Sequence, residues 1–189
     1  MSYDSAATRA RLLEAAYREF AERGLAGARV DRIAAAAQAN KQAIYAYFGS
    51  KENLFDAMLA ERLSVLSDTV PFDPDDLPGY AGALFDALNA TPELLRLTNW
   101  RALERNDTGP GWVESHTAKA KELRAAMGLR DEATAIDILE IVIAVSSAWV
   151  SVPSELRTVG SEDPDKRQHA HRAVVVAAVT AIRDALTND

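Results

Sequence analysis

Apolar residues recur along the chain at the spacing of helices that bury one face. Near the N-terminus they follow positions i, i+3, i+4, i+7 and i+8, at Leu13, Ala16, Tyr17, Phe20 and Ala21. We expect Tyr17 and Phe20 to lie in the core. Gly24 should end this helix, because glycine adopts the left-handed cap without a Cβ clash. No alternating strand pattern stands out, so the chain is predicted to be all-α.

Two short helices and a polar break follow. The first carries its apolar stripe over only two turns, at Val30, Ile33, Ala34 and Ala37. Asn40 is a good N-cap for the second, whose buried face is Ile44 and Phe48. Short helices joined by a turn of three to four residues are the elements of a helix-turn-helix, which we place at about residues 29–48.

The outward face of the second short helix suits DNA. If Ile44 and Phe48 point inward, the outward residues are Lys41, Gln42, Ala43, Tyr45 and Tyr47. The Gln42 amide can donate and accept at once, which matches N7 and N6 of adenine, although it could instead point at solvent or phosphate. We assign Ala43 to a thymine methyl, Lys41 to phosphate or guanine, and the two tyrosines to the DNA backbone.

The remaining pattern predicts a second helical region. A longer helix reaches about residue 66 and closes a domain of residues 6–66, and a proline-rich loop then opens a second domain of residues 67–189. Helices are expected there at about 79–90, 92–106, 113–127, 131–151 and 166–187. A link from Val152 to Pro164 joins the last two.

The helices expected at about 131–151 and 166–187 carry more apolar surface than a single hydrophobic core would bury. The run from Ile141 to Val150 is apolar almost all round, so it must be covered on both sides. One interpretation is a dimer interface of small and apolar residues, at Ala144, Ser147, Ala148, Val174, Ala177, Ala178 and Ala181. The alternative is that both helices are internal core.

Composition limits the other classes of function. The 189 residues include no cysteine, which excludes disulfides and thiolate zinc sites. The three histidines form no metal pair, and no phosphate loop or nucleophile motif occurs, so we expect neither an enzyme nor a metal or other cofactor. No signal-peptide pattern is present, and the run from Ile141 to Val150 is short for a bilayer. We therefore expect a cytoplasmic protein outside the membrane.

Charge is distributed unevenly. The whole chain carries a net charge of -7, but residues 1–55 hold eight Lys or Arg and six Asp or Glu, which leaves a net negative charge of nine on the rest. A mildly basic N-terminal part, residues 1–55, followed by an acidic remainder fits a protein in which only the N-terminal part contacts phosphate.

Residues 11–54 resemble the DNA-binding domain of the tetracycline-repressor (TetR) family. The resemblance rests on residues 15–24, on Val30-Asp31-Arg32-Ile33-Ala34, and above all on the run from Ile44 to Leu54, close to the family pattern Leu-Tyr-x-x-Phe-x-Ser-Lys-Glu-x-Leu. It implies a repressor that binds a double-stranded operator, dimerises through two C-terminal helices and is released by a small-molecule effector.

The resemblance also suggests further site residues. Lys51, at a helix start, would clamp a phosphate. Large side chains of the body could line an effector pocket or simply form core, at Phe85, Trp100, Trp112, Met127 and Trp149. Three departures from the family pattern concern the motif itself. Gln42-Ala43 stands where the family commonly has Gly-Thr, which loses a hydroxyl that could bond phosphate. Ala28-Arg29 replaces the usual Ser or Thr at the motif entrance, where the charge of Arg29 could contact phosphate.

The third departure is Gln38, which replaces the usual turn glycine, so the left-handed backbone there must be strained or reshaped. This missing glycine keeps a different class of protein open. That alternative is a helical adaptor that has lost DNA binding.

Overall fold

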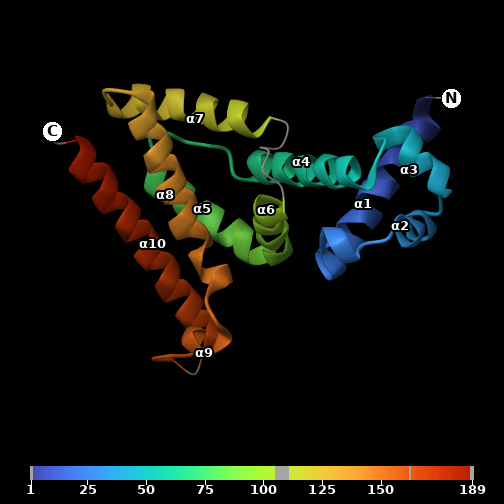
Figure 1. Ribbon diagram of the computed structural model, residues 1–189. Coiled ribbons are helices and arrows are strands. Elements are labelled where there is room, and N and C mark those ends of the chain that lie inside the picture. The colour runs from blue at the N-terminus through green and yellow to red at the C-terminus, as the bar shows by residue number, and fades with distance from the viewer. Residues whose placement is uncertain (1, 105–110, 162, 188–189) are drawn as a thin grey trace. The chain divides into compact units, whose positions relative to one another are not determined.

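The computed structural model describes residues 2–104, 111–161 and 163–187, with side chains for those from residue 5 to residue 186. Every regular element in these ranges is a helix, which confirms the predicted all-α class (Figure 1). The chain divides into two compact units. One holds residues 1–65 and 93–110, and the other holds residues 66–92 and 111–189.

The first unit contains four helices from the N-terminal part of the chain and one from further along. They are α1 (Ser2–Gly27), α2 (Val30–Ala36), α3 (Lys41–Phe48), most of α4 (Lys51–Thr69) and α6 (Pro92–Glu104). Phe20 and Phe55 are fully buried and meet edge to face, with ring centroids 5.0 Å apart. Tyr17 is only half-buried, so the prediction of a core position is confirmed for Phe20 but not for Tyr17, whose ring lies under the Arg62 guanidinium at 4.2 Å.

Gly24 breaks α1 as expected. Its φ is 69°, and a last helical turn follows it to Gly27. A side chain at this position would also meet the ring of Trp100 on α6, because a Cβ built on Gly24 lies 3.2 Å from the Trp100 Cζ3 atom. The glycine thus serves both the kink and the packing of α6.

Polar contacts fasten α6 within the first unit, although α6 falls in the 67–189 range expected for the second domain. The Arg101 Nε lies 3.0 Å from the Asp56 Oδ1 on α4, and the two side chains are only 11% and 12% exposed. The Arg96 guanidinium donates to the carbonyl of Ala21 on α1. These contacts explain why α6 groups with α1 to α4.

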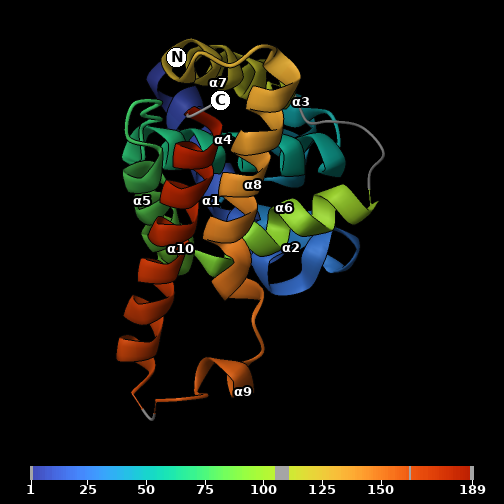
Figure 2. The same ribbon diagram turned by 90° about the vertical axis from the view of Figure 1, so that its left-hand side faces the viewer.

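The second unit contains α5 (Leu77–Ala90), α7 (Trp112–Met127), α8 (Glu132–Ser151), α9 (Ser154–Arg157) and α10 (Pro164–Thr187). Helix α5 packs against both α8 and α10, and α7 packs against α8 (Figure 2). The core is formed by apolar side chains of these helices, including the fully buried Phe85. Helix α9 is a single turn inside the segment predicted as an irregular link.

Helix α8 is, among the described residues, the one helix that is long and apolar enough to cross a membrane by length and composition. The run from Ile141 to Val150 is short, but the helix begins nine residues earlier and reaches 20 residues. One side of it packs on the core, where Ser146 Oγ donates to the Ala81 carbonyl at 3.2 Å. A core helix passes the same composition test.

Candidate nucleic-acid interface

The turn between α2 and α3 keeps the backbone that glycine usually provides. Gln38 has a φ of 52°, the one positive φ at a non-glycine position in the part of the chain that the structure describes. Its N–H donates to the Ala35 carbonyl at 3.1 Å, and the Ala39 N–H donates to the Ala34 carbonyl at 2.9 Å. This pair of bonds is the Schellman motif. The turn is therefore retained, with a side chain in a left-handed conformation.

Helix α3 begins and packs as the sequence predicts. The Asn40 side chain accepts a hydrogen bond from the Ala43 N–H at 2.8 Å, which caps the helix. Ile44 is fully buried and Phe48 is 8% exposed, and they hold one face of α3 against the unit. The backbone N–H of Gly49 closes the helix by donating to the Tyr45 carbonyl at 2.9 Å.

The opposite face of α3 presents the side chains proposed to meet DNA. Gln42 is exposed, Tyr45 is 46% exposed and Tyr47 is 38% exposed. Ala43 is half-buried, so it offers only a small apolar surface. The structure therefore exposes the predicted amide and phenols on one short helix, with Tyr45 and Tyr47 on its two flanks because they are two residues apart.

Charges at the start of α2 and α3 lie close together. Arg29 is the exposed N-cap residue of α2, and it makes no side-chain capping bond. The Lys41 ammonium lies 3.0 Å from the Asp31 carboxylate, and both side chains are about half exposed. The hydrogen bond to Asp31 holds the pKa of Lys41 above its usual value. Lys41 is cationic here, but Asp31 neutralises part of its charge.

Glu19 of α1 ties the start of α2 to the unit. Its Oε1 accepts from the Arg29 backbone N–H at 3.0 Å and from the Arg32 Nε at 2.7 Å, and its side chain is only 10% exposed. Burial raises the pKa of Glu19, but the hydrogen bonds from Arg32 and from the Arg29 N–H outweigh it and leave the pKa below the usual value. The carboxylate thus replaces the missing Ser or Thr cap at the motif entrance.

Lys51 stands at the start of α4 but turns toward α1. Its Nζ donates to the carbonyl of Leu25 at 2.8 Å and approaches the carbonyl of Ala28 at 3.4 Å. A lysine ammonium has three N–H donors, so one remains for a phosphate. The structure gives Lys51 a bracing role, and its contact with DNA stays a prediction.

Two residues of α1 that the sequence did not single out reach the helix-turn-helix. The Tyr47 hydroxyl donates to Ser5 Oγ at 3.0 Å, and the Arg11 Nε donates to the Ala37 carbonyl at 3.2 Å. These pairs are 42 and 26 residues apart in sequence, so no local spacing could have indicated them.

The residues proposed for effector binding do not form one group. Phe85 is fully buried and Trp149 is 4% exposed, and each ring lies near His171, with centroid distances of 5.9 Å and 4.8 Å. Met127 packs at the edge of the same core. Trp112 is 39% exposed and stacks on His116, and Trp100 lies in the first unit.

The small residues proposed for a dimer interface lie mostly at the surface of α8 and α10. Val174 is 64% exposed, and four alanines are exposed with it, at Ala144, Ala148, Ala177 and Ala181. Ser147 and Ala178 are half-buried. Ile141, which is 46% exposed, extends this apolar surface one turn along α8. The interpretation of both helices as wholly internal core is therefore wrong for the single chain.

Two family models match the chain. Residues 12–58 match the model described as bacterial regulatory proteins, tetR family, and residues 76–180 match that of the tetracyclin repressor-like C-terminal domain. The chain is similar to the HTH-type transcriptional repressor SCO4008 of Streptomyces coelicolor, with 42% identity over 168 residues that cover 85% of this chain and 88% of that protein. The repressor NicS of Pseudomonas putida is 44% identical over 52 residues, which are 28% of this chain and 24% of NicS.

Solved structures agree with these relatives. A transcriptional regulator from Streptomyces coelicolor, SCO4942, superposes with a TM-score of 0.77 at 38% identity, covering 93% of this chain and 97% of that one. A second Streptomyces coelicolor regulator, SCO7222, shares the fold at 17% identity, with a TM-score of 0.67 over 95% of this chain and 97% of that one. With a helix-turn-helix in the matching region, the chain belongs to the TetR family of DNA-binding transcriptional regulators.

Proposed function

We propose that α3 is the helix that enters the major groove and that Gln42 recognises a base. The observation that carries this proposal is the exposed polar face of α3, fixed by an N-cap at Asn40 and by the buried Ile44 and Phe48. Tyr45 and Tyr47 would hold the sugar-phosphate backbone. Arg29, Lys41 and Lys51 would supply charge for phosphates.

The alternative of an adaptor that has lost DNA binding depended on the missing turn glycine. Gln38 retains the Schellman turn, so α2 and α3 keep the geometry that the motif needs.

Selection of bound fragments from random duplexes tests the role of α3. The fragments define an operator, and Gln42→Ala should then bind that operator about 1–3 kcal/mol more weakly while its affinity for nonspecific duplex hardly changes. The preference at one base pair should disappear. A mutant that keeps the preference of the wild type at every position would show that Gln42 recognises no base.

We further propose that the protein is a homodimer held by the exposed apolar surface of α8 and α10. Val174 and Ile141 expose large apolar area, and neighbouring alanines allow helices to approach closely. Ala148→Arg should place a charge in the interface and give a monomer or a much weaker dimer in light scattering. Ala126→Arg on the exposed face of α7 is the matched control. Stable dimers of the Ala148 variant would place the interface elsewhere.

We infer that the protein is a repressor and that a small-molecule effector controls it. The second unit holds buried aromatic rings at Phe85 and Trp149, the chemistry suited to an apolar ligand. Such a ligand would favour a spacing of the two α3 helices that no longer matches adjacent major grooves, about 34 Å apart.

Compounds that raise the melting temperature should therefore also release the operator. A compound that stabilises the protein strongly but leaves DNA affinity unchanged would contradict this coupling. A regulator of this kind acts where bacterial DNA lies, in the cytoplasm.

A further inference from the structure

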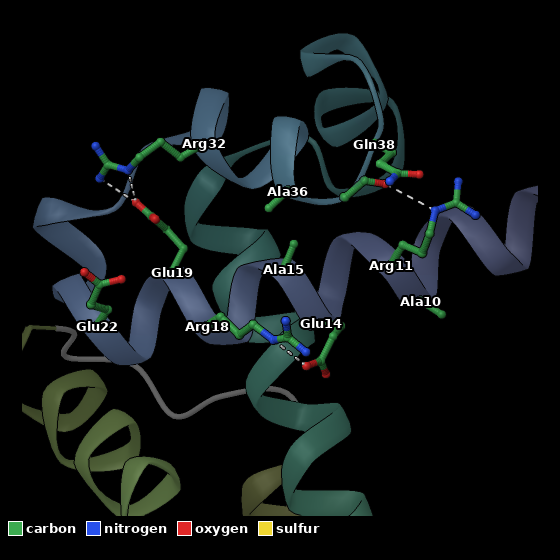
Figure 3. A pocket seen from close by; sticks show the side chains of 11 residues that line it. Ala10, Arg11, Glu14, Ala15, Arg18, Glu19, Glu22, Arg32, Ala36 and Gln38 are labelled. Atoms are coloured by element: carbon green, nitrogen blue, oxygen red, sulfur yellow. Dashed lines mark hydrogen bonds and ion pairs between the residues drawn. The ribbon is translucent and has the colours of Figure 1, made fainter.

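Helix α1 places an exposed arginine beside the turn of the helix-turn-helix. The Arg11 Nε donates to the carbonyl of Ala37, the C-cap residue of α2, at 3.2 Å (Figure 3). Its Nη2 donates to Thr8 Oγ1 at 3.0 Å. Both contacts fix the guanidinium next to Gln38, a few residues before α3 begins.

Charge pairing separates Arg11 from the other arginines of α1. Arg9, Arg18 and Arg23 lie 3.9, 2.9 and 2.8 Å from the carboxylates of Glu61, Glu14 and Glu22, respectively. Among residues 5–104, no carboxylate pairs with Arg11. The chain has 28 acidic and 21 basic residues, so carboxylates are numerous enough to pair with every basic side chain. The absence of a carboxylate partner at Arg11 among residues 5–104 is therefore a feature of its position.

The surface around Arg11 is a groove between α1 and α2. It encloses about 650 Å³ and is lined by small and charged side chains of both helices. Along it, Arg18 pairs with Glu14 and Arg32 with Glu19, whereas Arg11 sits at the end nearest Gln38 (Figure 3). The positive charge that remains available on this groove is therefore concentrated beside the turn.

This position agrees with the way a helix-turn-helix meets DNA. Its first helix crosses the phosphate backbone while the second lies in the groove. Arg29 is the N-cap residue of α2, and Arg11 contacts Ala37, the C-cap residue of the same helix. The two ends of α2 are about 12 Å apart along the helix axis. The contact of Ser5 with Tyr47 also places the start of α1 beside the outward face of α3.

We propose that Arg11 binds a DNA phosphate and that α1 forms part of the DNA-binding surface. The proposal rests on the proposed insertion of α3 into the major groove. Arginine has five N–H donors, and its two contacts in the free protein leave three for phosphate oxygens. The Ala37 carbonyl holds the guanidinium in place before DNA arrives, so little side-chain freedom is lost on binding.

The salt dependence of DNA binding tests this proposal. A plot of the logarithm of the DNA-binding constant K against the logarithm of salt concentration becomes steeper by about 0.9 for each phosphate contact. Arg11→Gln should therefore reduce the magnitude of this slope by about 0.9 per protomer, or about 1.8 for a dimer. The loss should be equal on operator and nonspecific duplex. Arg18→Gln is the matched control, an exposed α1 arginine that already has a carboxylate partner, and its slope should equal that of the wild type.

Further variants separate a DNA contact from a structural role. Arg11→Lys keeps the charge and should keep the slope of the wild type. If Arg11→Gln does not fold by circular dichroism, Arg11→Met retains the long apolar stem and serves the same test. An unchanged slope in a folded, uncharged variant overturns the proposal even if its affinity falls, and so does an equal loss in Arg18→Gln. If DNA binding by the wild-type protein does not depend on salt concentration, that result would instead contradict the proposed function itself.

Discussion

Replacement of Gln38 by glycine should stabilise the protein. Gln38 holds a φ of 52° in the Schellman turn after α2, where a Cβ atom crowds the backbone. The left-handed conformation costs about 1–2 kcal/mol for a residue with a side chain. Glycine removes this cost but adds freedom to the unfolded chain, which costs about 0.4–1 kcal/mol. The difference between these two figures is a net gain of about 0–1.6 kcal/mol in the free energy of unfolding, with a midpoint of about 0.8 kcal/mol.

Urea unfolding measures this gain directly. The midpoint for Gln38→Gly should rise while the slope with denaturant stays unchanged, because the surface exposed on unfolding is the same. For a chain of this length, the melting temperature should rise by about 1–4 °C. Ala39→Gly is the matched control. Ala39 has no positive φ, so this change should destabilise the protein through the unfolded state.

The two glycine variants should therefore shift stability in opposite directions. If Gln38→Gly destabilises the protein as Ala39→Gly does, the left-handed backbone at Gln38 carries no net cost. The Gln38 side chain would then make a favourable contact in the groove between α1 and α2 that offsets the strain.

Three further changes follow from the ion pairs of the first unit. Arg101→Ala should lower the free energy of unfolding by about 1–3 kcal/mol, because it removes a charge-assisted hydrogen bond between two side chains that are nearly buried; urea unfolding checks this. The difference in free energy of unfolding between the wild type and Glu19→Gln should be constant near neutral pH and should decline as the pH falls below about 4.5. The reason is that folding lowers the pKa of Glu19, so the stabilisation is lost when the carboxylate is protonated. Asp31→Asn should steepen the salt dependence of DNA binding with little change in melting temperature, since it frees an exposed Lys41.

Local signals were sufficient for the helices and for the shape of the motif. The N-cap at Asn40 and the buried pair Ile44 and Phe48 depend on neighbours within one or two turns, and the structure agrees with each. Gly24 likewise has the positive φ that its position at the end of a stripe predicts. Helix α9 was missed because four residues are too few to show a helical period.

Contacts between distant residues could not be predicted in this way. The bond from Lys51 to the Leu25 carbonyl and that from Arg11 to the Ala37 carbonyl each join residues 26 apart, so they depend on how α1 packs against the motif. The grouping of α6 with the first unit depends on Trp100 and Arg101, whose partners lie on α1 and α4. Sequence reasoning thus located the outward face of α3 but not the side chains that support it.

Binding of the wild-type protein to duplex DNA across a range of salt concentrations tests the central claim most directly. Operator duplex selected from random sequence and a scrambled duplex of equal length would be compared by fluorescence anisotropy. We expect log K to fall linearly with log salt for both, with a slope of several units from phosphate contacts, and tighter binding of the operator throughout. Binding that does not depend on salt, or equal affinity for both duplexes, would contradict a sequence-specific DNA-binding role for α3.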